Sequence, residues 1–244
     1  MPLQLNLEKS QAALKLCLEK VGIAQPPKMD MGVGLDVSGS FDDEHQDGTT
    51  NLLVSRLVPW GLTFDPDGKL DLATFSDGAR HVQMVESVTA KNYENFVKRH
   101  VIRKVAGWGG GTTYSHVMHR FLEEFGWIQP DKPGFVARLF GAREAPAVAK
   151  RRSLVIVITD GENTDPRETD ALLRDSEARQ DQVFFLFLAV SNQGGKFPFL
   201  HQIDQRHRNC GVVVVDQVRQ FVKKSDDEIN EMLLLPKLVD WLKR

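Results

Sequence analysis

The sequence predicts an α/β domain with a mainly parallel β-sheet that is covered by helices on both faces. A continuous aliphatic run at residues 154–158 (LVIVI) is typical of a strand that is buried on both sides in such a sheet. Further apolar runs occupy residues 183–190 and 212–215, and segments with helical spacing lie between the runs. The chain has 244 residues, of which 41% are hydrophobic and 26% charged, enough for one large domain with a sizeable core.

An amphipathic helix is predicted near the N-terminus, at about residues 7–21, because leucine, cysteine and valine residues recur there at helical spacing. Asn6 or Ser10 is a suitable cap for its first turn. A glycine and two prolines then separate this helix from the first strand. We therefore expect an N-terminal helical extension over residues 1–27 and one domain over residues 28–244.

The middle of the chain alternates helical and extended patterns. A helix is expected from Thr49, and Pro59 should kink or end it because proline removes a backbone donor. Alternation and turn residues predict a β-hairpin over residues 70–85, with its second strand at a sheet edge. Thr89 is a candidate cap for a following helix. Residues 127–150 are rich in proline, glycine and basic residues, which predicts an irregular insertion.

The first strand ends in Asp36, Ser38 and Ser40, three oxygen-bearing side chains at alternate positions. Side chains alternate along an extended chain, so the first two lie on one face and the loop can bring in the third. A carboxylate and two hydroxyls are hard oxygen ligands that suit magnesium or manganese better than zinc. A turn after an apolar strand is the alternative interpretation of the same residues.

Two further loops carry polar residues to the same edge of the predicted sheet. Asp160 follows the 154–158 run, and a glycine-rich loop ends in Thr112 and Thr113, where a helix begins. Loops of this kind gather at the carboxyl edge of an open α/β sheet, where ligands bind. Two carboxylates would balance a divalent ion and hydroxyls would add neutral oxygens. The alternative interpretation is that the threonine serves only as a helix cap.

The residues DVSGS at 36–40, GGT at 110–112 and TDG at 159–161 resemble the three parts of the metal-ion-dependent adhesion site of the von Willebrand factor A domain. The resemblance covers about residues 28–243 and implies a doubly wound sheet with one antiparallel edge strand. Two segments, GGTTYSHVM and RLVPWGLTFDPDGKLDLATF, look most similar to the bacterial tellurium-resistance type and its copine relatives. Carried over by position, the implied metal ligands are Asp36, Ser38, Ser40, Thr112 and Asp160.

The function implied by the resemblance is a non-enzymatic, metal-dependent protein-binding module. The expected ion is Mg²⁺ or Mn²⁺, with Ca²⁺ less favoured, and an Asp or Glu of a protein partner would complete its coordination. A bacterial stress system of the tellurium-resistance type is the setting that the resemblance suggests. The partner itself and the oligomeric state are left open.

Two other functions are compatible with the same residues. A metal-dependent hydrolase or phosphatase would need a base, for which His116 and His119 are candidates. However, Ser38 stands where a haloacid-dehalogenase-type site would have a second aspartate. The third possibility is a structural α/β protein whose site has decayed, although all five implied ligands are present.

Composition also limits which functions and cellular locations are compatible with the sequence. A net charge of −2 gives no support to nucleic-acid binding. The two cysteines, Cys17 and Cys210, indicate no disulfide framework and fit a reducing compartment. No signal peptide or apolar run of membrane-spanning length is visible, so we expect a cytoplasmic protein without an integral membrane segment.

Overall fold

The computed structural model describes residues 6–129, 149–192 and 194–244. Its centre is a sheet with the strand order β3-β2-β1-β5-β6-β7, in which the edge strand β3 is antiparallel to β2 and β7 forms the other edge. The short strand β4 also pairs with β2 in the antiparallel sense, whereas all other neighbours are parallel. This confirms the predicted mainly parallel, doubly wound sheet. The strands are β1 Asp30–Asp36, β2 Lys69–Phe75, β3 Gln83–Met84, β4 Val88–Thr89, β5 Ser153–Thr159, β6 Val183–Val190 and β7 Cys210–Val215.

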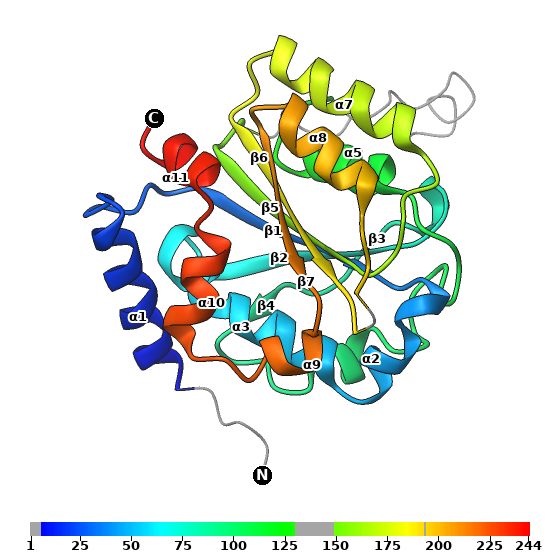
Figure 1. Ribbon diagram of the computed structural model, residues 1–244, viewed down its shortest axis with the longest axis horizontal. Helices are drawn as coiled ribbons and strands as arrows, with labels where there is room; N and C mark the ends of the chain where they lie inside the picture. Colours follow the sequence, from blue (N-terminus) through cyan, green and yellow to red (C-terminus); the bar gives the residue numbers. More distant parts are fainter. Residues whose placement is uncertain (1–5, 130–148, 193) are drawn as a thin grey trace, which may run out of the picture.

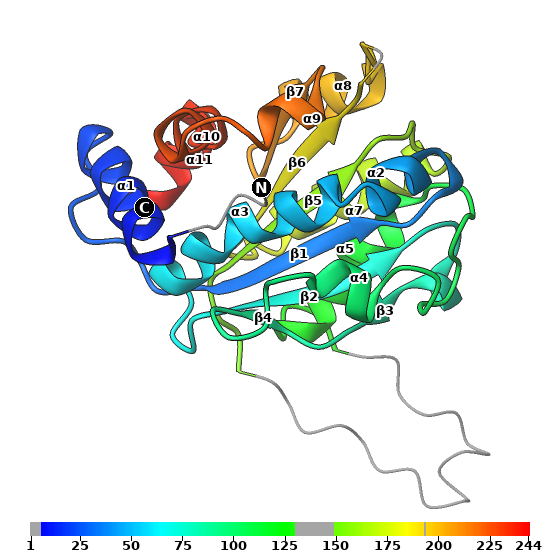
Figure 2. The ribbon, with the colours of Figure 1, turned by 90° about the horizontal axis from the view of Figure 1, so that it is seen from below.

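Helices cover both faces of the sheet (Figures 1 and 2). The layer formed by α5, α7 and α8 lies on one face, and α1, α3, α10 and α11 pack on the other. No helix among the described residues is both long and apolar enough to span a bilayer. The helices are α1 Leu7–Lys20, α2 Asp42–Gln46, α3 Thr49–Phe64, α4 Phe96–His100, α5 Tyr114–Glu124, α7 Pro166–Ala178, α8 Pro198–Arg206, α9 Val218–Phe221, α10 Asp226–Leu233 and α11 Pro236–Leu242, with short 3₁₀ turns at Gly39–Phe41 and Ala79–His81.

Strand β5 explains why the aliphatic run is continuous. Leu154, Ile156 and Ile158 belong to the core on the α1 and α3 side of the sheet. Val155 and Val157, which alternate with them, belong to the core under α5 and α7. All five are fully buried, so each face of the strand needs apolar side chains.

Helix α1 confirms the predicted N-terminal helix. The Asn6 side chain caps it by accepting a hydrogen bond from the backbone N–H of Lys9 at 3.1 Å. Ser10 is no cap, because its hydroxyl donates to the Asp226 carboxylate at 2.7 Å instead. Leu14 and Leu18 are fully buried in the core that α1 shares with α3 and α10.

Two local predictions need correction. Helix α3 does not end at Pro59 but continues to Phe64, whereas the alternative expectation of a kink stays a prediction. Pro59 and the adjacent Trp60 are buried, so the packing of this helix on the sheet outweighs the one backbone bond that proline removes. Thr89 caps no helix. It lies in β4, and α4 begins only at Phe96, after Asn95 with a φ of 53°.

The predicted hairpin at 70–85 is confirmed by the antiparallel pairing of β2 with β3. The predicted insertion at 127–150 falls largely on residues 130–148, which lie outside the described residues.

Candidate metal site

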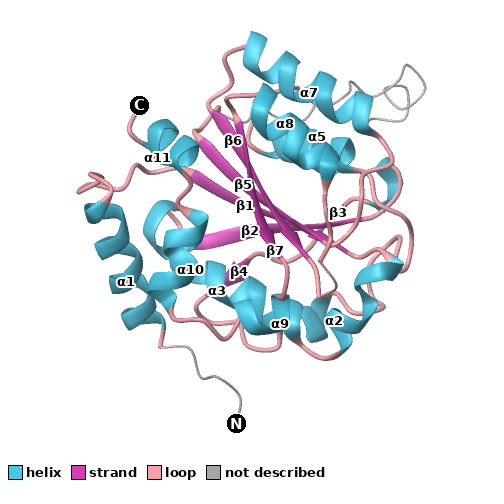
Figure 3. Cartoon of the chain, in the orientation of Figure 1, coloured by secondary structure: helices cyan, strands magenta, loops and turns pink. Residues whose placement is uncertain are grey.

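The parallel strands β1, β5 and β6 direct their carboxyl ends to the edge of the sheet where α2 lies (Figure 3). Asp36 is the last residue of β1, and Ser38 and Ser40 follow it in the loop that leads to α2. Thr112 lies in the loop before α5, and Asp160 comes directly after β5. Since β1 and β5 are neighbours in the sheet, these three loops meet at its carboxyl edge.

Asp36 is the buried centre of the site. Its Oδ1 accepts a hydrogen bond from the backbone N–H of Ser38 at 2.8 Å. Its Oδ2 accepts from the hydroxyl of Thr159 at 2.7 Å and from that of Thr112 at 3.4 Å. The side chain is fully buried, so these donors satisfy a carboxyl group that water does not reach.

Asp160 brings the other predicted side chains together. Its Oδ1 accepts from the hydroxyl of Ser40 at 2.9 Å and from that of Ser38 at 3.4 Å. The two serine hydroxyls lie 3.2 Å apart. All five side chains predicted from the sequence therefore lie in one connected cluster.

The two carboxyl groups are poorly stabilised as anions. Burial raises the pKa of Asp36 to about 6, although hydrogen bonds from Thr159 and Ser38 oppose the rise. Burial and the nearby charge of Asp36 raise the pKa of Asp160 to about 7. A divalent cation between them would favour both ionised forms, so the electrostatics fit a bound ion.

The donor set also fits a hard divalent cation. Two carboxylates and three hydroxyls are oxygen ligands of the kind that Mg²⁺ and Mn²⁺ prefer, and the set lacks the thiolates and imidazoles that are common in zinc sites. The described residues contain no cluster of three or more His, Cys, Asp or Glu side chains placed to hold a metal.

Backbone hydrogen bonds join the first loop to the glycine-rich loop. The N–H of Gly39 donates to the carbonyl of Gly110 at 3.0 Å, and that of Gly109 donates to Val37 at 2.9 Å. Gly109 has a φ of 78°, which a residue with a side chain rarely adopts. Gly161 is needed for a different reason, because a Cβ atom there would lie 2.9 Å from the Thr112 hydroxyl.

The third loop is joined to the start of α5. The hydroxyl of Thr164 donates to the carbonyl of Thr112 at 2.7 Å. The Asp165 carboxylate accepts from the backbone N–H groups of Tyr114 at 2.9 Å and Ser115 at 3.0 Å, so it caps the helix. The Tyr114 hydroxyl donates to the carbonyl of Gly161 at 2.6 Å. These contacts fix the loop that carries Asp160.

The two adjacent threonines, Thr112 and Thr113, make different contacts. The Thr113 hydroxyl donates to the carbonyl of Ser76 at 2.9 Å and accepts from the N–H of Gly78 at 3.1 Å. Thr113 occupies the N-cap position of α5 without a side-chain capping bond, while Thr112 faces Asp36. The structure thus places Thr112, and not Thr113, in the cluster.

His45 is a residue of the site that the sequence analysis missed. Its Nε2 lies 2.9 Å from the carbonyl of Asp36, and its Nδ1 lies 2.8 Å from the Thr50 hydroxyl. A carbonyl only accepts, so Nε2 carries the hydrogen and Nδ1 accepts from Thr50. Burial lowers the pKa of His45 to about 4, which keeps the ring neutral. The ring packs between Phe41 and Trp108, with 5.0 Å between centroids on each side.

The candidate bases of the alternative enzyme do not join the cluster. His119 is 52% exposed, and its Nδ1 lies 3.8 Å from Glu123 on the same helix. Within the described residues, neither His116 nor His119 has a recorded hydrogen bond to any of the five clustered side chains.

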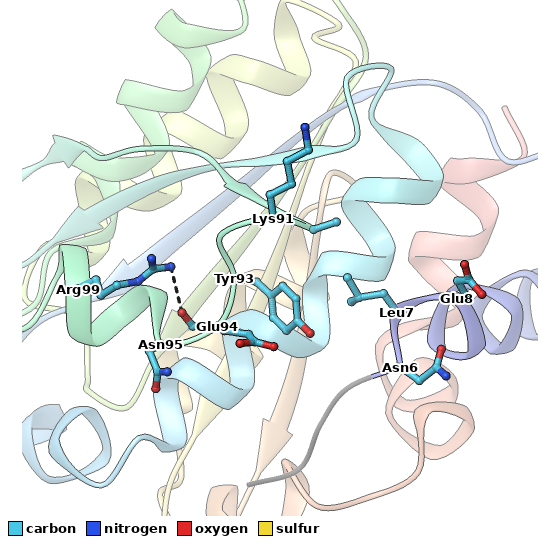
Figure 4. Close-up of a pocket in the computed structure, with 9 residues that line it drawn as sticks. Asn6, Leu7, Glu8, Lys91, Tyr93, Glu94, Asn95 and Arg99 are labelled. Carbon is cyan, nitrogen blue, oxygen red and sulfur yellow. Dashed lines mark hydrogen bonds between the residues drawn. The ribbon is translucent and has the colours of Figure 1, made fainter.

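A separate cleft of about 630 Å³ lies between the start of α1 and residues 90–99 (Figure 4). Its charged side chains have both signs, with Lys91 and Arg99 beside Glu8 and Glu94. The Arg99 guanidinium is already bonded to the carbonyls of Asn92 and Glu94. The cleft shares no residue with the metal-site cluster.

Comparisons with known proteins agree with this fold. The family model vWA-TerF-like, described as the vWA found in the TerF C terminus, matches residues 28–244. The uncharacterized protein YcbR of Bacillus subtilis (strain 168) is 22% identical over 243 residues, which cover 98% of this chain and 87% of YcbR.

Solved structures show the same fold. Proximal thread matrix protein 1 from the mussel byssus, in its crystal form 2, matches 89% of the chain with a TM-score of 0.53 and 13% identity. The chain spans about half of that protein, 49% of its length. Another structure of the mussel protein has a zinc-occupied MIDAS motif. Its match covers 85% of this chain and 50% of the mussel chain, with a TM-score of 0.49 and 15% identity.

Proposed function

Because the chain belongs to the vWA-TerF-like family, we propose that it is a non-enzymatic, metal-dependent protein-binding domain. The ion is held by two carboxylates, Asp36 and Asp160, and by the hydroxyls of Ser38, Ser40 and Thr112. Some of these groups act through water, as is common for magnesium. The ion retains an open coordination position for an Asp or Glu side chain of a partner protein.

One observation carries this proposal. Two carboxyl groups with raised pKa values face a set of hydroxyls at the carboxyl edge of the sheet, and their loops are already fixed by hydrogen bonds. A protein that used these residues only for folding would gain nothing from two carboxyl groups that repel each other when ionised.

The oxygen donors favour Mg²⁺ or Mn²⁺ as the physiological ion, with Ca²⁺ third because it prefers more ligands. The family's namesake, TerF, supports a bacterial stress system of the tellurium-resistance type, and we place the protein in the cytoplasm of such a cell. The N-terminal residues 1–27 extend the binding domain, which occupies residues 28–244.

Calorimetric titration of chelator-stripped protein with MgCl₂ and with MnCl₂ tests the metal site. We expect binding by the wild type and none by Asp36→Ala or Asp160→Ala. Asp43→Asn is the matched control, since it removes an exposed carboxylate of α2 that lies outside the cluster. Equal heats in the wild type and both alanine variants would disprove the site.

A further inference from the structure

A pocket of about 220 Å³ opens directly beside the proposed metal site. Two of the metal-site residues, Ser40 and Asp160, form part of its wall. The end of β6 and the start of α9 contribute Val190 and Val218, and Phe41 completes the apolar part of the lining. Its volume corresponds to about seven water molecules at roughly 30 Å³ each, which is room for one side chain of a partner.

The polar wall of the pocket carries a nearly buried carboxylate, that of Glu44 on α2. Its Oε1 accepts from the side-chain amide of Asn192 and lies 3.2 Å from a guanidinium nitrogen of Arg219. Both of these partners contact Oε1, so among the described residues Oε2 is the oxygen that a further donor can use. Asp160 also has its recognised contacts on one oxygen, because the hydroxyls of Ser38 and Ser40 both contact its Oδ1.

The charge around this wall is negative. Helix α2 and the residue after it carry Asp42, Asp43, Glu44 and Asp47, the acidic segment that the metal site itself does not use. Arg219 contacts Glu44 and also Asp47, at 2.6 Å, so one guanidinium serves two of these four carboxylates. His45, on the same helix, is neutral. The negative charge extends to the metal site, since Glu44 and Asp160 line the same pocket.

We propose that this pocket receives a Lys or Arg side chain of the partner, adjacent to the acidic side chain that binds the metal. The inference rests on the proposed metal-dependent binding. The partner's recognition segment therefore has two charges of opposite sign, within two residues of each other. The acidic group contacts the ion, and the basic group contacts Glu44 while its aliphatic part packs on Phe41, Val190 and Val218.

The test is selection of peptides from a random phage-displayed library on the Mg²⁺-loaded full chain, with elution by EDTA. We expect the eluted peptides to contain Asp or Glu, with Lys or Arg enriched at least about fivefold within two residues of it. The same selection on Glu44→Gln should yield acidic peptides without that basic neighbour. Asp43→Asn removes the same charge from an exposed position on α2, so it should retain the basic preference.

The possible outcomes distinguish the proposal for the pocket from the proposal of metal-dependent binding. Acidic peptides without basic enrichment would overturn the pocket's role and leave the metal-dependent binding intact. A basic preference that survives Glu44→Gln, or that is lost equally in Asp43→Asn, would also overturn it, because the general field of α2 would then be the cause. If EDTA elutes no peptide at all, the metal-dependent binding fails and the inference fails with it.

Discussion

His45 is a single buried side chain that would position the proposed metal site without contacting the ion. Its Nε2–H donates a hydrogen bond to the backbone carbonyl of Asp36, and its Nδ1 accepts one from the Thr50 hydroxyl. Outer groups of this kind orient the first ligands of a metal and tune its affinity. Because the ring is neutral, it acts through hydrogen bonding and packing and adds no positive charge to the site.

We expect His45→Phe to weaken Mg²⁺ binding about tenfold, because the ring can still pack against Phe41 and Trp108 but no longer holds the Asp36 carbonyl. The free energy of unfolding should fall by about 1–3 kcal/mol, since a buried carbonyl loses its donor. Calorimetry and urea denaturation measure the two effects. His119→Phe, at a half-exposed position of α5, should change neither. Unaltered Mg²⁺ affinity in His45→Phe would exclude a positioning role.

The raised pKa values of Asp36 and Asp160 predict how the metal-free protein responds to pH. Their folded pKa values, about 6 and about 7, lie above those of an unfolded aspartate, so the folded state binds more protons. The stability that these carboxyl groups contribute is therefore complete below about pH 4 and is lost as the pH rises through 6 and 7.

In EDTA, we expect the free energy of unfolding of the wild type to decrease by about 4 kcal/mol between pH 5 and pH 8. Asp160→Asn should show a smaller decrease and should be the more stable protein at pH 8. Urea denaturation at a series of pH values measures this. The idea is refuted if the metal-free wild type becomes more stable across that interval.

At the scale of single elements, helix α5 depends on a cap from a distant loop. Asp165 accepts from two of its first backbone N–H groups, and the same loop carries Asp160. The cap thus links helix stability to the position of a metal ligand.

Asp165→Ala should lower the free energy of unfolding by about 1–2 kcal/mol and also weaken Mg²⁺ binding. Ser225→Ala is the matched control, because Ser225 caps α10 through a capping box. It should lower stability by about 1 kcal/mol and leave Mg²⁺ affinity unchanged. Denaturation and calorimetry on both variants distinguish the two outcomes, and equal Mg²⁺ affinity in all three proteins would contradict the link.

The sequence predicted the elements whose signal is local. The buried strands, the hairpin and the helix capped by Asn6 follow from apolar patterns and turn residues within a few positions. The caps and supports that it missed, Asp165 and His45, depend on partners far along the chain or on burial that no short pattern reveals. The helix did not end at Pro59, because tertiary packing overrode a local preference.

The same distinction, between local sequence signals and contacts among distant residues, applies to the candidate metal site. Its polar residues follow directly after strands, so the topology of a parallel sheet brings them together. The choice of Thr112 over its neighbour came from resemblance, and the structure places it beside Asp36. The pocket around Glu44 was beyond prediction, since it needs β6, α2 and α9 to be placed relative to one another.

For the whole molecule, α1 shares a core with the sheet instead of standing apart. Its buried face packs on α3 and α10, and Arg56 of α3 pairs with Asp226 at 2.7 Å beneath it. We therefore propose that residues 7–20 unfold together with the rest of the domain.

Leu14→Ala should lower the free energy of unfolding by about 2–5 kcal/mol while keeping one cooperative transition. Leu16→Ala, on the exposed side of the same helix, should change it by less than about 0.5 kcal/mol. Far-UV circular dichroism and tryptophan fluorescence should give coincident urea curves. Separate transitions in Leu14→Ala would mean that the helix is an independent appendage.

The hydroxyl hydrogens that now point at Asp36 and Asp160 stand in for the positive charge of an ion. When a cation binds, the hydroxyls of Ser40 and Thr112 would have to turn their lone pairs toward it, and any proton held by a carboxyl group would leave for the buffer. The heat of Mg²⁺ binding at pH 6.5 should therefore differ between phosphate and Tris, and the difference should vanish by pH 8.5. The proposed site would in this sense exchange protons for metal, and acidification of its surroundings would release the ion.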